Sequence, residues 1–116
     1  MHLKRFADAQ PYEAINHFHM TGLRLQGFED NGPVNQWVGL SHFLPGGGAG
    51  PDATPFEKVY VVLEGEMTVI IGDEETTLGK YDSCTIPPEE VRTIENKRND
   101  ICTMLVVIPY PPEKQP

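Results

Sequence analysis

Between residues 35 and 108, short apolar and β-branched runs alternate with glycine, proline and polar turn residues. Strands of four to ten residues with turn signals at short, even intervals are typical of an all-β sandwich or barrel. The pattern therefore predicts a single all-β domain. Its expected strands cover residues 35–44, 58–63, 67–71, 76–78, 83–86, 91–95 and 102–108.

The segments outside these runs are patterned differently. Residues 46–50 carry four glycines and are followed by Pro51, so we expect a loop there rather than a strand. Residues 1–34 are weakly patterned and predict an N-terminal arm or edge segment, in which 9–19 would form a short helical turn or an extended arm. Residues 35–108 form the predicted barrel, and the proline-rich residues 109–116 predict an extended C-terminal tail.

Composition narrows the class of protein. The 116 residues include 11 glycines and 11 prolines, which suits short strands and tight turns better than long helices. Nine basic residues stand against 17 acidic ones, for a formal net charge of −8. This charge disfavours nucleic acid as a partner, because a polyanion would be repelled. A small anion remains possible, since a pocket can carry a local charge of opposite sign.

The sequence also predicts the cellular location of the protein. No apolar run approaches the roughly 20 residues that a membrane-spanning helix needs, and the basic pair near the N-terminus is not followed by an apolar stretch. We therefore expect a cytoplasmic protein with no membrane partner. Cys84 and Cys102 lie in apolar strands, which predicts two reduced core cysteines rather than a disulfide.

From Gly46 onward the sequence resembles the cupin superfamily. The first cupin motif is a glycine, five residues, His-x-His, three residues, a glutamate, six residues and a glycine. At these spacings this chain has Gly46, Asp52-Ala53-Thr54, Lys58 and Gly65. The second motif has a Gly-Asp pair, a proline, a histidine and an asparagine. The matching residues here are Tyr81-Asp82, Pro87, Arg92 and Asn96, and fifteen residues separate Gly65 from Tyr81.

The resemblance implies a jelly-roll barrel (a double-stranded β-helix) and a homodimer. In metal-binding cupins the two histidines, the glutamate and the later histidine are the metal ligands. Here these positions hold Asp52, Thr54, Lys58 and Arg92. Threonine is a poor ligand, and the two cations would repel a metal ion. We therefore predict neither a metal nor another cofactor.

The four replaced positions are the predicted substrate-binding residues. Because side chains alternate along a strand, Lys58 shares its face with Tyr60 and Val62. The hypothesis is that Lys58 and Arg92 bind the carboxylate or phosphate of a small organic acid. The alternative is that they form internal ion pairs with Asp52 or Glu89.

His42 and Tyr60 are the predicted groups for proton transfer. The ordinary pKa of histidine suits that chemistry, but His42 shares an otherwise apolar face with Val38, Leu40 and Leu44, where a core role is the alternative. Tyr60 has the same alternative, as an aromatic core residue. Trp37 and Phe43 lie on the opposite strand face from His42, and would line a pocket or pack between sheets.

Three functions stay open at this point. One is a metal-independent isomerase, cyclase or lyase that uses Lys58 and Arg92 to stabilise negative charge. Another is a ligand-binding or accessory protein without catalysis. The last is a metalloprotein with other ligands, which would come from His17, His19, His42, Asp52 and Glu57. His17 and His19 are two residues apart and on a strand would project to one face.

Overall fold

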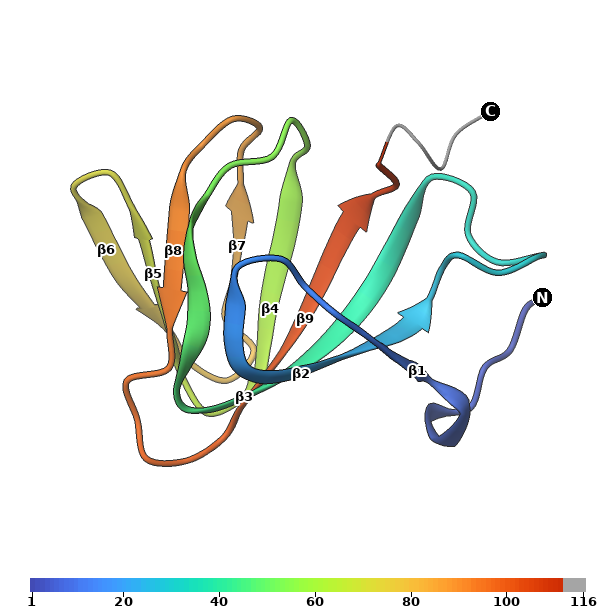
Figure 1. Cartoon of the computed structure of the whole chain (residues 1–116), viewed down its shortest axis with the longest axis horizontal. Coiled ribbons are helices and arrows are strands. Elements are labelled where there is room, and N and C mark those ends of the chain that lie inside the picture. Colours follow the sequence, from blue (N-terminus) through green and yellow to red (C-terminus); the bar gives the residue numbers. More distant parts are fainter. Residues whose placement is uncertain (112–116) are drawn as a thin grey trace.

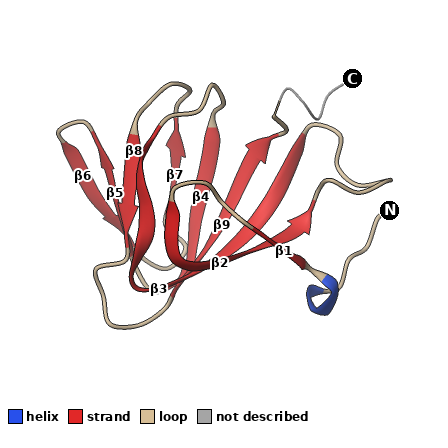
Figure 2. Ribbon diagram, viewed as in Figure 1, coloured by secondary structure: helices blue, strands red, loops and turns tan. Residues whose placement is uncertain are grey.

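The computed structural model describes residues 1–111 of the chain (Figures 1 and 2). These residues contain nine strands and one 3₁₀ turn (Phe6–Asp8), joined by loops. The strands are β1 (Gln10–Tyr12), β2 (His17–Gln26), β3 (Gln36–Asp52), β4 (Lys58–Glu64), β5 (Met67–Ile71), β6 (Glu74–Leu78), β7 (Ser83–Ile86), β8 (Arg92–Glu95) and β9 (Cys102–Pro109).

The strands form one antiparallel sheet that rolls into a nearly closed barrel. Its order is β6-β5-β8-β3-β9-β4-β7, with β2 on the other edge of β3 and β1 on β2. The long strand β3 joins the two halves, because residues 36–43 pair with β9 whereas residues 48–52 pair with β8. The predicted all-β jelly-roll architecture is confirmed.

The expectation of a glycine loop at residues 46–50 is wrong. This segment continues β3, where Gly48 pairs with Phe18 on one side and with Glu95 on the other. The glycines are needed because neighbouring strands approach very closely. A Cβ on Gly48 would lie 2.0 Å from the carbonyl oxygen of Ile94, and one on Gly47 would lie 2.3 Å from that of His19. Glycine here permits close strand packing rather than a turn.

The N-terminal segment is also more regular than predicted. Residues 9–19 form no helical turn but are largely extended, since they contain β1 and the start of the ten-residue strand β2, which pairs along β3. The alternation in β2 is weak because most of its residues are only partly buried. A β-bulge lies between Phe18 and Met20, and the φ angle of His19 is +50°.

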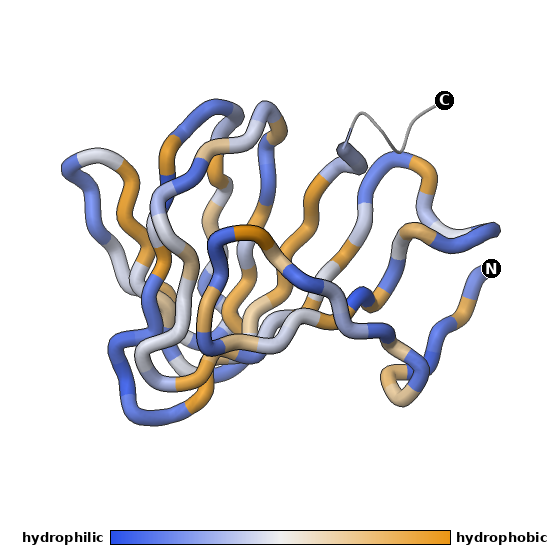
Figure 3. Tube along the Cα trace, viewed as in Figure 1, coloured by the Kyte–Doolittle hydropathy of each residue, from blue (hydrophilic) through white to orange (hydrophobic). Residues whose placement is uncertain are grey.

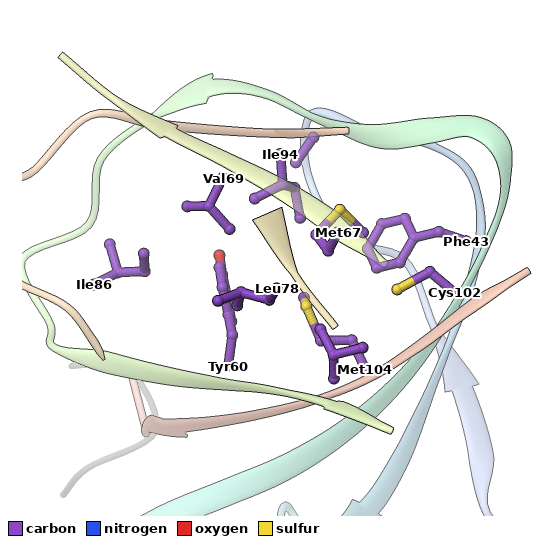
Figure 4. Close-up of a cluster of buried hydrophobic side chains, with 11 residues drawn as sticks. Phe43, Tyr60, Met67, Val69, Leu78, Ile86, Ile94, Cys102 and Met104 are labelled. Carbon is purple, nitrogen blue, oxygen red and sulfur yellow. The ribbon is translucent and has the colours of Figure 1, made fainter. Parts of the chain in front are cut away.

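The core fills the space between the two halves of the barrel (Figure 4). Side chains alternate along β4 as predicted, with Lys58, Tyr60 and Val62 buried. Residues 96–100, between β8 and β9, form a hydrophilic turn (Figure 3). Cys84 is partly buried, Cys102 is buried, and both are free thiols, as expected. Burial raises the pKa of Cys102 to about 11.

The C-terminal end of the described chain packs against the loop between β2 and β3. The hydroxyl of Tyr110, which is buried, donates a hydrogen bond to the carbonyl oxygen of Pro33 at 2.6 Å. Of the predicted C-terminal tail, Pro109 instead ends β9 and Tyr110 is packed, while residues 112–116 lie outside the described part of the chain. Residues 1–111 contain no helix long and apolar enough to cross a membrane.

Candidate functional site

A cavity of about 380 Å³ opens where β4, β8 and β9 meet the segment between β1 and β2. Its volume falls within the range of small-molecule pockets. Five of the six predicted site residues line this cavity, and His42 does not. The cavity-lining residues are Tyr12, Glu13, Ala14, Ile15, His17, Arg24, Phe28, Trp37, Asp52, Thr54, Phe56, Lys58, Tyr60, Arg92, Val106, Ile108, Pro109 and Pro111.

Lys58 and Arg92 place two cations in this cavity. Lys58 begins β4 and Arg92 begins β8, and their side chains are only 5% and 4% exposed. Both residues stand at inward positions of the strand alternation. Burying a charged group in this way costs free energy unless another charge or several hydrogen bonds compensate it.

Arg92 is fixed by two hydrogen bonds. Its Nε donates to the hydroxyl of Tyr60 at 2.8 Å, and its Nη1 donates to the carbonyl oxygen of Gly50 at 3.0 Å. Within residues 1–111, Nη2 donates to no protein group. The guanidinium is therefore held rigidly and keeps free donors. Burial raises the pKa of Tyr60, and the neighbouring Arg92 opposes that shift.

Asp52 and Thr54 occupy the rim of the same cavity. Asp52 at the end of β3 is the register partner of Arg92 on β8, yet its Oδ1 accepts a hydrogen bond from the backbone N–H of Ala53 at 2.9 Å. The hydroxyl of Thr54 donates to the carbonyl oxygen of Phe56 at 3.1 Å. Both side chains are therefore engaged by the local backbone.

The ion-pair alternative finds no support in the described part of the chain. No carboxylate oxygen of residues 1–111 lies within 4.0 Å of the Lys58 amine or the Arg92 guanidinium. Glu89, the other candidate partner, is exposed. The two cations thus lack a directly bonded counter-charge.

Electrostatics in the cavity favour neutral bases. Burial and, to a smaller extent, the Arg92 guanidinium lower the pKa of Lys58 to about 8, against the opposing effect of the Asp52 carboxylate. Burial likewise lowers the pKa of His17, while its hydrogen bond to the backbone of Ile15 opposes this. Because Nδ1 of His17 donates to the Ile15 carbonyl oxygen at 2.7 Å, the neutral ring keeps Nε2 as an acceptor.

The structure separates the histidines that the metal alternative requires. His17 lines the cavity and stacks on Phe43, with ring centroids 6.5 Å apart, whereas His19 is exposed beyond the bulge in β2. His42 is absent from the cavity wall, since its neighbours Ser41 and Phe43 point to the interior. Glu57 is exposed in the loop before β4.

The metal of the cupin motif does not fit this site. Three or more histidine, cysteine, aspartate or glutamate side chains gather nowhere in residues 1–111 in a way that could hold a metal ion. At the motif positions, Lys58 and Arg92 supply N–H donors where a metal needs electron pairs. No chemical step is therefore assigned to a metal.

One wall of the cavity is formed by β2 and the β1–β2 loop, and the sequence did not predict it. Arg24 lies against three aromatic rings, with its guanidinium carbon 4.0 Å from the Phe28 ring centroid and 5.2 Å and 5.8 Å from those of Tyr12 and Trp37. Its buried Nε has no hydrogen-bond partner. Only the prediction that Trp37 would line a pocket pointed to this wall.

A protein-family model and a curated protein both match most of this chain. The family model for the cupin domain matches residues 39–108. The chain is 40% identical over 111 residues to the β-D-galactosidase Rv1717 of Mycobacterium tuberculosis, and the match covers 96% of each chain.

Solved structures share the fold at lower identity. The polyketide cyclase RemF of Streptomyces resistomycificus is 21% identical with a TM-score of 0.82, and the match covers 94% of this chain and 79% of that one. An RmlC-like cupin of Shewanella frigidimarina is 16% identical with a TM-score of 0.78, covering 98% and 95%.

Proposed function

This chain belongs to the cupin family, and on that premise we propose that its barrel binds a small organic anion without a transition metal. The anion would occupy the position that a metal takes in metal-binding cupins, with Arg92 and Lys58 as its ligands. The observation that carries this proposal is the burial of both cations in one cavity with no carboxylate within 4.0 Å among residues 1–111.

The free donors of the site match a carboxylate or phosphate. Arg92 is held by Tyr60 and Gly50 through Nε and Nη1, which leaves Nη2 and the second hydrogen of Nη1 for two oxygens of one ligand. The Lys58 amine supplies a further donor. A bound anion would also compensate the cost of burying these cations.

The same groups suit a reaction that develops negative charge. A guanidinium and an ammonium fixed in a buried cavity would stabilise an enolate. The Tyr60 hydroxyl accepts its hydrogen bond from Arg92, so its own hydrogen is free to be donated to substrate. An isomerase, cyclase or lyase reaction is the enzymatic form of this proposal, and a binding protein without turnover is its other form.

A ligand screen with matched variants tests the proposal. Thermal unfolding of the metal-free protein is followed with a panel of small carboxylates and phosphates, and the best ligand is then titrated by calorimetry. Arg92→Met is expected to weaken its binding roughly ten- to a hundredfold, because it removes charge-assisted hydrogen bonds of about 1.5–3 kcal/mol.

Arg98→Met is the control, because it removes the same charge from an exposed arginine whose contacts are Glu66 and Asp100. It should leave binding unchanged. Equal weakening by both variants would indicate a nonspecific charge effect and contradict the proposal, as would a panel in which no anion stabilises the protein.

A second candidate function is hydrolysis of β-D-galactosides. The observation that favours it is the similarity to the mycobacterial β-D-galactosidase, which is 40% identical over 96% of both chains. The cavity also holds the two carboxylic acids Glu13 and Asp52 beside the aromatic rings of Tyr12 and Trp37. Most glycosidases use a pair of carboxyl groups as acid and as base or nucleophile.

Release of nitrophenol from nitrophenyl β-D-galactoside tests this second candidate. Asp52→Asn and Glu13→Gln should each reduce kcat at least about a hundredfold if these carboxyls carry the reaction. The exposed Glu57→Gln is the control and should keep full activity. Turnover that survives both cavity variants would contradict the role of these two carboxyl groups.

A further inference from the structure

The Lys58 amine differs from the other described lysines in having no partner. Lys4 pairs with Glu29, Lys80 with Glu64 at 3.2 Å and Lys97 with Glu75 at 3.5 Å. Lys58 makes neither a hydrogen bond nor an ion pair within residues 1–111, although its side chain is only 5% exposed and lines the cavity. A lysine that is almost wholly buried, with an amine in the cavity wall that bonds to no protein group, requires an explanation.

We propose that Lys58 is a nucleophile that forms an imine with the carbonyl carbon of a small oxo acid. This inference rests on the proposed anion site, because Arg92 would bind the carboxylate of the same molecule while Lys58 meets its carbonyl group. It narrows the ligand from organic anions in general to those that carry an aldehyde or ketone.

The surroundings of Lys58 keep a useful fraction of the amine neutral. Burial and the neighbouring Arg92 lower its pKa to about 8, while Asp52 opposes the shift. The other titratable groups lining the cavity are Tyr12, Glu13, His17 and Tyr60, together with the arginine Arg24. At pH 8 about half of the amine would be neutral, on the order of a hundredfold more than for a lysine of ordinary pKa. Only the neutral amine attacks a carbonyl group.

The step balances without a further reactant. The Nζ lone pair forms a bond to the carbonyl carbon, and the carbonyl π electrons move to oxygen. The two amine protons are transferred to that oxygen, which leaves as water while the C=N double bond forms. Tyr60 and His17 line the same cavity and are the groups available to move these protons. Nothing is oxidised or reduced.

Reductive trapping with pyruvate tests the inference. The full-length protein is incubated at pH 8 with pyruvate and sodium cyanoborohydride, and adducts are located by intact-mass and peptide mass spectrometry. One reduced pyruvate adduct per chain is expected on Lys58, formed at least about tenfold faster than any adduct on the exposed Lys97.

Variants separate this inference from the anion site on which it rests. Lys58→Met should lose the adduct and Lys97→Met should keep it. Lys58→Arg should also lose the adduct, but because it keeps the buried charge it should bind the anion more tightly than Lys58→Met does. Arg92→Met should slow labelling by pyruvate about tenfold or more beyond any slowing of labelling by neutral acetone, because acetone reports only the loss of neutral amine that follows when Arg92 no longer lowers the Lys58 pKa.

Anion binding that persists without any adduct on Lys58 would overturn the imine and leave the anion site standing. Adducts spread equally over the exposed lysines would overturn it as well. Labelling of Lys58 that is the same in Arg92→Met would support the reactive amine and contradict the anion site.

Discussion

At the scale of single residues, one buried amide joins the middle of β3 to the β8–β9 turn. Asn96 has no exposed surface, and its Nδ2 donates to the carbonyl oxygens of Phe43, Leu44 and Asp100 at 2.8–3.2 Å. Its Oδ1 accepts from the backbone N–H of Arg98 at 3.0 Å. The asparagine that the second cupin motif contains is thus a structural residue here.

Asn96→Ala is predicted to lower the free energy of unfolding by about 2–4 kcal/mol, because it leaves buried carbonyl groups without donors. Urea denaturation measures this loss. The exposed Asn99→Ala serves as the control and should change stability by less than about 0.5 kcal/mol. Similar losses in the two variants would show that the buried hydrogen bonds contribute little.

Lys58 gives stability a dependence on pH. Its pKa is about 8 in the folded chain, against an ordinary value of 10.5, so between these values the unfolded chain binds more protons than the folded one. Stability therefore rises with pH across this window. Below pH 8 both states carry the charge, and its burial penalty is fully present.

Comparison with Lys58→Met isolates this contribution, since the variant lacks the titrating amine. The stability of the wild-type protein relative to Lys58→Met should rise between about pH 8 and pH 10.5 and be level below that window. Chemical denaturation at several pH values measures the difference. A flat difference across the window would show that the Lys58 pKa is not depressed.

At the scale of elements, the turn before β7 contains a residue in an unfavourable conformation. Tyr81 has a φ angle of +67° and stands where the second cupin motif has glycine. Its backbone N–H donates to the carbonyl oxygen of Val62, and its ring is 72% exposed. The turn geometry is kept although the residue does not favour it.

Tyr81→Gly is predicted to raise the free energy of unfolding by about 1 kcal/mol, because glycine adopts positive φ without a Cβ penalty. Tyr81→Ala removes the exposed ring but keeps the Cβ, so it should bring no gain. Thermal unfolding of the two variants compares them directly. Equal stability of both would mean that the backbone conformation carries no cost.

The sequence predicts elements well where the hydrophobic alternation is strong. The expected strand at 58–63 corresponds to β4, and those at 67–71 and 83–86 match β5 and β7. It fails for residues 46–50, since glycines that permit close strand contact look like turn residues. It also fails for β2, whose partial burial gives no clear alternation.

At the scale of the whole molecule, the site differs in charge from the protein around it. The chain carries a formal net charge of −8, yet the cavity contains the cations Lys58 and Arg92, with Arg24 in its wall. The proposed small anion would therefore be recognised by local charge rather than by the overall field. The motif spacing was enough to predict that Asp52, Thr54, Lys58 and Arg92 lie in one site, because these motif positions have fixed places in the fold.

The remainder of the site depends on contacts between distant segments. His17 and Glu13 reach the cavity because β2 pairs along β3 and carries the β1–β2 loop over the barrel. No local pattern in residues 1–34 encodes this placement. His42 was a candidate for proton transfer from its residue type alone, and its position outside the cavity wall does not favour that role.

The central claim is that two cations and an organic anion replace the metal centre of this barrel. The most direct measurement is the metal content of tag-free purified protein by plasma mass spectrometry. The account predicts only trace metal, far below one ion per chain, because Lys58 and Arg92 supply no electron pairs to an ion. About one bound transition-metal ion per chain would contradict it.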